Sequence, residues 1–236
     1  MNGSYERWDS YGRERSPRKQ RALHLHHALA QKKIVSLLKE IESSVQVMDI
    51  GCGDGFFLDL LLRMGFTRVR GIDPGRSMVD RCLERGLPAA RGSLEELSGE
   101  NLYDLVLLIE VLEHLDDPAA ALEKIKVLLR PGGKLLLTVP VCDSLLKRYH
   151  RRRYGVKKIE QVTDWDETHL HAFSGNEIVK MATSLDFRVE RCLHASNPFP
   201  WAGRYGGKRI SEFFQRLDFG GRFGDILIVL ASTPHE

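Results

Sequence analysis

The chain has 236 residues, of which 42% are apolar and 28% are charged. This composition is typical of a folded globular protein and excludes disordered and fibrous classes. The formal net charge of +3 is too small to indicate a nucleic-acid-binding protein by itself. The four cysteines form no C-x-x-C pair, which argues against a zinc site or a disulfide framework.

The amino-terminal end gives no sign of export or of membrane insertion. No apolar run approaches the roughly 18 residues that a membrane-spanning helix needs, and the polar start lacks the apolar core of a secretory signal. We therefore expect a cytoplasmic protein without a transmembrane segment. Residues 1–17 mix Gly, Ser, Arg and Tyr and are predicted to form a mobile basic arm, followed by a single domain over residues 18–236.

The first half of this domain alternates between two hydrophobic periods. Residues 18–42 have helical spacing, and short β-branched runs at 45–50 and 69–73 then alternate with helical stretches at 56–64 and 77–86. A third strand is expected near Ala89. This alternation is typical of βαβ units and predicts an α/β fold with a parallel sheet.

The second half continues the sheet and adds two irregular segments. The nearly continuous apolar run from Tyr103 predicts a central strand that is buried on both faces. The further predicted elements are a helix at 118–129, a strand at 135–140, a helix at 174–185 and strands at 187–195 and 225–232. Between them, residues 140–173 and 197–224 lack clear periodicity and are predicted to be cap segments, the first lying over the carboxyl ends of the strands.

A glycine-rich turn follows the first predicted strand. Residues 47–55 read VMDIGCGDG, and Asp73 ends the next strand twenty residues after Gly53, where such folds bind ribose hydroxyls. Asp49 and Asp54 would repel the pyrophosphate of a dinucleotide, but they would attract the ammonium and sulfonium groups of S-adenosylmethionine. The turn therefore favours S-adenosylmethionine over NAD.

With these motifs, the chain resembles the class I S-adenosylmethionine-dependent methyltransferases over about residues 30–190. It is most similar to the branch that includes the ubiquinone-biosynthesis O-methyltransferases. The segments that carry the resemblance are VMDIGCGDG, GIDPGRSMV, GSLEEL, YDLVLLIEVLEHLDDP and LRPGGKLLLTVP. The resemblance implies a Rossmann-like, seven-stranded, mostly parallel sheet of order 3-2-1-4-5-7-6, with an antiparallel seventh strand and helices on both faces.

The resemblance also implies which residues bind the cofactor. Gly51 and Gly53 would pass under the methionine moiety, Asp73 would bind both ribose hydroxyls, and Ile109 would close the methionine side. Ser93 and Leu94 would flank the adenine. The full expected cofactor-binding set is Asp49, Gly51, Gly53, Gly55, Asp73, Met78, Ser93, Leu94 and Ile109.

A second group of polar residues follows the predicted fourth strand. If a helix begins near Glu110, then Glu110, Glu113 and His114 share one face at the carboxyl end of that strand. Carboxylates with one imidazole suit Mg²⁺ or Mn²⁺. The later run DETHLHAFS adds His169 and His171.

The resemblance favours His169 as the further metal ligand. Both the ubiquinone-type enzymes and the small-RNA 2′-O-methyltransferases carry an E-x-x-E-H element associated with a divalent metal, and the latter carry a further histidine at a similar place. The predicted metal ligands are Glu110, Glu113, His114 and His169, and His114 and His169 are also the candidate general bases. The alternative stays open, because acidic residues in a first helical turn are favourable without any metal and many relatives with this run are metal-free.

A basic run at 147–158, KRYHRRRYGVKK, lies within the first predicted cap. It could contact an anionic acceptor, RNA or an acidic membrane surface, or it could be a solvated loop. The sequence thus predicts a methyltransferase that acts on an oxygen of a small-molecule acceptor. The alternatives are an RNA methyltransferase and a non-catalytic protein that keeps the cofactor-binding fold.

Overall fold

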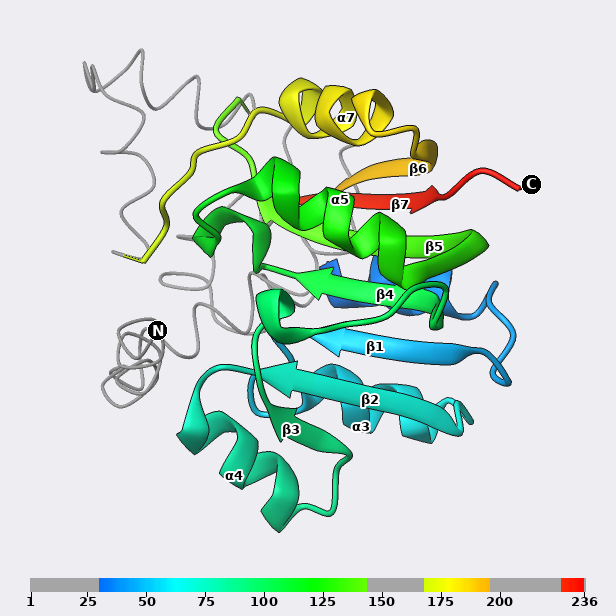
Figure 1. Ribbon diagram of the computed structural model, residues 1–236, viewed down its shortest axis with the longest axis vertical. Helices are drawn as coiled ribbons and strands as arrows, with labels where there is room; N and C mark the ends of the chain where they lie inside the picture. The colour runs from blue at the N-terminus through cyan, green and yellow to red at the C-terminus, as the bar shows by residue number, and fades with distance from the viewer. Residues whose placement is uncertain (1–29, 144–167, 196–225, 236) are drawn as a thin grey trace, which may run out of the picture.

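The computed structural model describes residues 30–143, 168–195 and 226–235 (Figure 1). Within these ranges one seven-stranded sheet has the order β3-β2-β1-β4-β5-β7-β6. In chain order the strands are β1 (Gln46–Ile50), β2 (Arg68–Asp73), β3 (Ala89–Arg91), β4 (Tyr103–Ile109), β5 (Leu129–Pro140), β6 (Arg188–Ala195) and β7 (Ile226–Ser232). The predicted strand order is confirmed.

The strands β1 to β5 pair in parallel, whereas β7 runs antiparallel to both β5 and β6. The arrowheads of β1, β2 and β4 therefore point to the same edge of the sheet (Figure 1). The loops that follow these strands meet at that edge, which is where open α/β sheets bind ligands.

Helices cover both faces of the sheet. They are a helix at residues 30–38, α3 (Phe56–Arg63), α4 (Arg76–Glu84), α5 (Pro118–Leu128) and α7 (Gly175–Ser184). Capping residues in the sequence explain where two of these helices begin. The side chain of Asp117 accepts hydrogen bonds from the amides of Ala119 and Ala120 before α5, and Ser174 forms a capping box with Glu177 before α7.

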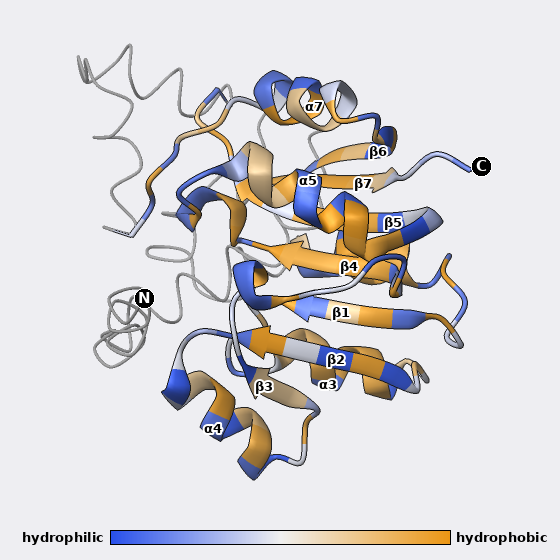
Figure 2. Cartoon of the chain, viewed as in Figure 1, coloured by the Kyte–Doolittle hydropathy of each residue, from blue (hydrophilic) through white to orange (hydrophobic). Residues whose placement is uncertain are grey.

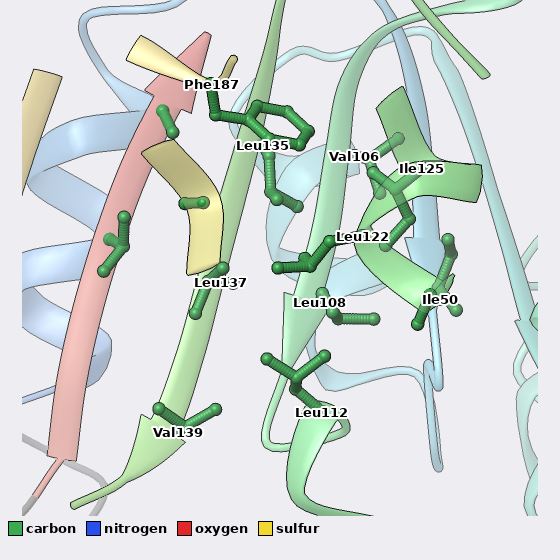
Figure 3. Packing of buried hydrophobic residues seen from close by; sticks show 14 of the residues in the cluster. Ile50, Val106, Leu108, Leu112, Leu122, Ile125, Leu135, Leu137, Val139 and Phe187 are labelled. Carbon is green, nitrogen blue, oxygen red and sulfur yellow. The ribbon is translucent and has the colours of Figure 1, made fainter. Parts of the chain in front are cut away.

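The central strand β4 is buried on both faces, as its continuous apolar sequence predicts. Val106 and Leu108 pack with α5 on one face, while Leu105 and Leu107 pack with α3 and residues 30–38 on the other. Figure 2 shows β4 as an apolar strand in the middle of the sheet, and Figure 3 shows the packing on the α5 side. The sheet thus gives the loops at its carboxyl edge a close-packed support.

Two boundaries differ from the predictions. β5 begins at Leu129 rather than near residue 135, because the Pro-Gly-Gly segment forms an irregularity within the strand instead of ending the extended chain. No helix begins near Glu110, so the prediction that Glu110, Glu113 and His114 share a helical face was wrong. A single 3₁₀ turn, η2 (Leu112–His114), follows β4, and α5 starts only at Pro118.

Most of the predicted arm and cap segments lie outside the described residues, as do residues 147–158. The two described ends of the first cap segment meet at the carboxyl end of β5. Val141 and Phe173 form a parallel bridge, and the amide of Cys142 donates to the carbonyl of Phe173 at 2.8 Å. Within the described ranges, no helix has the length and apolar character needed to cross a bilayer.

Candidate active site

The glycine-rich turn connects β1 to α3 through left-handed backbone. Gly51 has φ of +73°, and a Cβ added there would collide with Cγ2 of Val111. The amides of Gly51 and Cys52 both donate to the carbonyl of Ile72, at 2.8 and 3.0 Å. The turn therefore lies against the end of β2 on one side and against the residues after β4 on the other.

Asp73 holds this turn in place from the end of β2. Its Oδ2 accepts the amide of Gly53 at 2.9 Å, and its Oδ1 accepts the amide of Gly75 at 2.8 Å. Burial raises the pKa of Asp73, and the two amide hydrogen bonds partly oppose that rise. Each carboxylate oxygen keeps a second lone pair, so Asp73 can accept further hydrogen bonds from a ligand.

Asp49 lies beneath the turn and is only 2% exposed. Its Oδ2 is buried and has no hydrogen-bond partner within the described part of the chain. Burial, and next the charge of Asp73, raise the pKa of Asp49 to about 7. A cation above the turn would relieve the repulsion between these two carboxylates, whereas a phosphate would add to it.

The other residues of the predicted cofactor-binding set are distributed around this turn. Ser93 caps the short 3₁₀ turn η1 (Leu94–Glu96), in which the Leu94 side chain is 3% exposed and belongs to the core. Leu94 is thus a buried residue that anchors the η1 turn beside Ser93. Met78 lies in the first turn of α4 and Ile109 is the last residue of β4, and both are partly exposed.

The backbone reverses direction directly after β4. Glu110 has φ of +55°, its amide donates to both the carbonyl and Oγ1 of Thr138 at 3.1 Å, and its Oε1 accepts the Thr138 hydroxyl at 2.7 Å. Thr138 was not among the residues predicted from the sequence. The available signal was one hydroxyl residue within the otherwise apolar strand LLLTVP.

Three of the four predicted metal ligands come together beyond this reversal. The candidate ligand atoms of Glu113, His114 and His169 all lie within 4.8 Å of one another. Nε2 of His114 and Nε2 of His169 are each 4.0 Å from Oε1 of Glu113. Glu110 is outside this group.

Backbone contacts explain how residues more than fifty positions apart reach the same place. The amides of Leu170 and His171 both donate to the carbonyl of Glu113, at 2.9 and 3.2 Å. The Nδ1 of His114 is 3.1 Å from the carbonyl oxygen of Thr168. Residues 168–171 are thus attached to η2 through the carbonyl of Glu113 and through the ring of His114.

Both oxygens of Thr168 contact the imidazole of His114, because the Thr168 hydroxyl oxygen also lies 3.1 Å from Nδ1. The carbonyl can only accept a hydrogen bond and the hydroxyl can donate or accept one, so these contacts are compatible with both tautomers of the ring. Nε2 of His114 faces Glu113. The arrangement can accept a proton or coordinate a cation. His171 instead stacks on Phe173, with ring centroids 5.7 Å apart.

Comparisons with known proteins agree with this geometry. Residues 18–191 match a family model described as a methyltransferase domain. A ubiquinone biosynthesis O-methyltransferase of Vibrio vulnificus is 28% identical over 151 residues, which are 60% of this chain and 63% of that protein. A tRNA U34 carboxymethyltransferase of Idiomarina loihiensis is 33% identical over 112 residues, which are 43% of this chain and 35% of that protein. The match thus spans less than two thirds of the length of each relative.

Solved structures show the same fold. A putative methyltransferase in complex with the Trm112 methyltransferase activator of Haloferax volcanii has a TM-score of 0.69 at 19% identity, and the match covers 100% of both chains. The magnesium protoporphyrin IX methyltransferase of Synechocystis PCC 6803, solved with bound SAH, has a TM-score of 0.66 at 19% identity and covers 98% of this chain and 95% of that one. Because the matching family model spans well over half of the chain, the protein belongs to the class I S-adenosylmethionine-dependent methyltransferases.

Proposed function

We propose that this enzyme binds S-adenosylmethionine at the turn of residues 51–55 and transfers its methyl group to an oxygen of a small molecule. Three features of the turn support the cofactor site. Gly51 lets the turn pack directly against Val111, Asp73 keeps acceptor capacity for ribose hydroxyls, and Asp49 places a buried carboxyl beneath a cationic ligand. Gly53, Gly55, Met78, Ser93, Leu94 and Ile109 are proposed to complete the site.

Oxygen is the proposed acceptor atom because the imidazoles of His114 and His169 come together beyond the carboxyl end of β4, at the same edge of the sheet as the turn of residues 51–55. Val111 packs on Gly51, and His114 follows three residues later. The cofactor supplies a sulfonium-bound methyl group. His114, or else His169, would accept the proton of an acceptor hydroxyl as the oxygen bonds to the methyl carbon, and the broken carbon–sulfur bond leaves its electron pair on sulfur. Holding the two reactants in line supplies much of the remaining rate enhancement.

This grouping of His114 and His169 at the end of β4 is the observation that carries the proposal. To test it, the protein is incubated with methyl-labelled S-adenosylmethionine and fractionated cell extract, and the labelled product is identified. We expect the label on an oxygen of a small molecule, and its loss in the double variant His114→Ala, His169→Ala with retained cofactor binding. Label in RNA would instead favour an RNA methyltransferase. That alternative is supported by the similarity to a tRNA U34 carboxymethyltransferase and by the basic run at 147–158. Cofactor binding without any labelled product would favour the non-catalytic alternative.

A divalent metal at Glu113, His114 and His169 is a second candidate, favoured by the mutual approach of their ligand atoms. A metal there would lower the pKa of a bound acceptor hydroxyl and hold it in position. The sequence predicted Mg²⁺ or Mn²⁺ with Glu110 as a fourth ligand. Two imidazoles with one carboxylate shift the preference toward a transition metal such as Mn²⁺, Fe²⁺ or Zn²⁺.

The metal is tested apart from the proton-transfer role. We expect the purified protein to bind one equivalent of Mn²⁺ or Zn²⁺ in calorimetry, and Glu113→Gln to abolish that binding while cofactor affinity is kept. Acid should weaken metal binding, because both imidazoles must be neutral to coordinate. Full methyl transfer in excess chelator would reject the metal and leave His114 and His169 as bases.

A further inference from the structure

Glu110 has an unusual backbone conformation for its residue type. Three non-glycine residues have positive φ within the described ranges: Asn101, Asp186 and Glu110. Asparagine and aspartate enter the left-handed region readily, but glutamate does not. Strain of this kind persists where surrounding contacts enforce it, and it gathers at functional sites.

Thr138 provides those contacts through both of its polar groups. Its carbonyl and its hydroxyl oxygen accept the amide of Glu110, and its hydroxyl hydrogen is donated to the Glu110 carboxylate. Thr138 is 1% exposed and pairs with Ile109, the last residue of β4. A rigid, buried β5 residue thus holds the backbone and the side chain of Glu110 together.

The reversal at Glu110 places the residues that follow it. Val111 comes to lie on Gly51, where no Cβ separates it from the cofactor turn. Two and three residues later, Glu113 and His114 reach His169. The conformation of Glu110 therefore sets the position of the acceptor-side residues relative to the cofactor turn.

We propose that Thr138 is a positioning residue of this methyltransferase, whose hydroxyl holds Glu110 in the left-handed turn and so keeps Val111 against Gly51. The Glu110 carboxylate then stabilises the turn after β4 by accepting the Thr138 hydroxyl, and it is not required as a metal ligand. The inference rests on the cofactor site of the proposed function and is independent of which acceptor atom takes the methyl group.

The test compares Thr138→Val with two other variants. Valine keeps the volume and the β-branch but removes the hydroxyl, and we expect roughly tenfold weaker binding of S-adenosylhomocysteine in calorimetry, equivalent to one hydrogen bond to a charged group. Thr138→Ser restores the hydroxyl and should bind within about threefold of the wild type. Thr233→Val is the matched control, because Thr233 is 4% exposed and its hydroxyl donates to the carbonyl of Arg130 at the amino end of β5.

We expect Thr233→Val to lower the unfolding midpoint about as much as Thr138→Val, with unchanged cofactor affinity. A double-mutant cycle with Glu110→Ala tests whether Thr138 acts on cofactor binding through Glu110. If it does, the double variant should lose no more affinity than the weaker-binding single variant, because both substitutions break the same Thr138–Glu110 interaction. Any of four results would overturn the proposal. They are wild-type affinity in Thr138→Val, an equal loss of affinity in Thr233→Val, weak binding in Thr138→Ser, and additive losses in the cycle. None of these outcomes depends on the acceptor, so a wrong acceptor assignment is recognised separately by the labelling experiment.

Discussion

The ends of β1 and β4 lie at the same edge of the sheet, and the turns that follow them are stabilised in different ways. Each strand must turn sharply through left-handed backbone, and each turn carries carboxylates. After β1, Gly51 takes the left-handed conformation without a side chain in the way, and Asp73 fastens the turn through backbone amides. After β4, a glutamate takes it and depends on Thr138 to hold it there.

The two turns differ in how far apart along the chain the residues of each candidate site lie. The β1 turn is proposed to bind the cofactor through its backbone and through one carboxylate on the adjacent strand, so its parts have fixed spacing along the chain. The β4 turn becomes a site only when residues 168–171 return to it. Its chemistry therefore depends on a long-range contact, whereas the chemistry of the β1 turn does not.

The largest effect is expected for Gly51→Ala, which gives the β1 turn the side chain that it lacks. Left-handed alanine costs about 1 to 2 kcal/mol. Overpacking against the stiff β-branched Val111 costs about 1 to 3 kcal/mol more. If the turn moves to escape both, cofactor affinity should fall by roughly 100-fold in calorimetry.

Gly65→Ala is the matched control for this variant. Gly65 has φ of +92°, but a Cβ there would meet nothing within 4 Å. The substitution should lower the free energy of unfolding by about 1 to 2 kcal/mol without changing cofactor affinity. If Gly51→Ala binds the cofactor as well as Gly65→Ala does, the close packing of the β1 turn is not needed for binding.

The two turns also differ in how far the sequence predicted them. The parallel α/β class, the turn after β1 and the place of Asp73 followed from hydrophobic periods and contiguous motifs, whereas the strand order followed from the resemblance to class I methyltransferases. The structure brings together three of the four residues that were predicted as one group, Glu113, His114 and His169, but not through the helical face on which the prediction was based, and Glu110 lies outside the group. Periodicity could not reveal that Glu110 is left-handed, because that conformation is imposed by Thr138 from another strand and not by the local sequence.

The next effect concerns Asp73, which fastens the β1 turn and is proposed to bind ribose. Asp73→Ala should weaken cofactor binding by about 1 to 3 kcal/mol, or roughly 5- to 150-fold, because buried amides and hydroxyls lose their acceptor. Asp104→Ala is a suitable control, since Asp104 also accepts a backbone amide, that of Gln46 at 2.7 Å, but at the opposite edge of the sheet. Equal losses of affinity in both variants would exclude a direct role for Asp73.

A smaller, pH-dependent effect is expected from Asp49. Its pKa is raised to about 7 by burial and then by Asp73, so it is mostly protonated in slightly acidic solution. A cationic cofactor favours the charged form, and binding should release a proton. Between pH 5 and 7 affinity should rise with pH by at most about tenfold per unit and then level off, and Asp49→Asn should lose this rise. Asp59→Asn, at a partly exposed position of α3, should keep it.

The stability of the cofactor-free protein gives an independent check on Asp49. A carboxyl with a folded-state pKa near 7 and an ordinary value of 3.8 binds more protons in the folded state between these pH values. The free energy of unfolding should therefore fall as pH rises from about 4 to 7, relative to Asp49→Asn. Parallel stability profiles of the two proteins would show that Asp49 titrates normally.

The smallest effect is expected where the two turns touch. Val111→Ala removes the methyl groups that face Gly51 but leaves the backbone of residues 110 and 111 held by Thr138, so alone it should weaken cofactor binding only about two- to threefold, the cost of a partly buried apolar contact. In the Gly51→Ala background it should instead improve binding, because the added Cβ no longer meets Cγ2 and only the left-handed strain remains. Calorimetry on the four proteins of this cycle measures the coupling between the ends of β1 and β4. Additive effects would mean that Val111 does not transmit the position of the β4 turn to the cofactor turn, and that the two strand ends act independently.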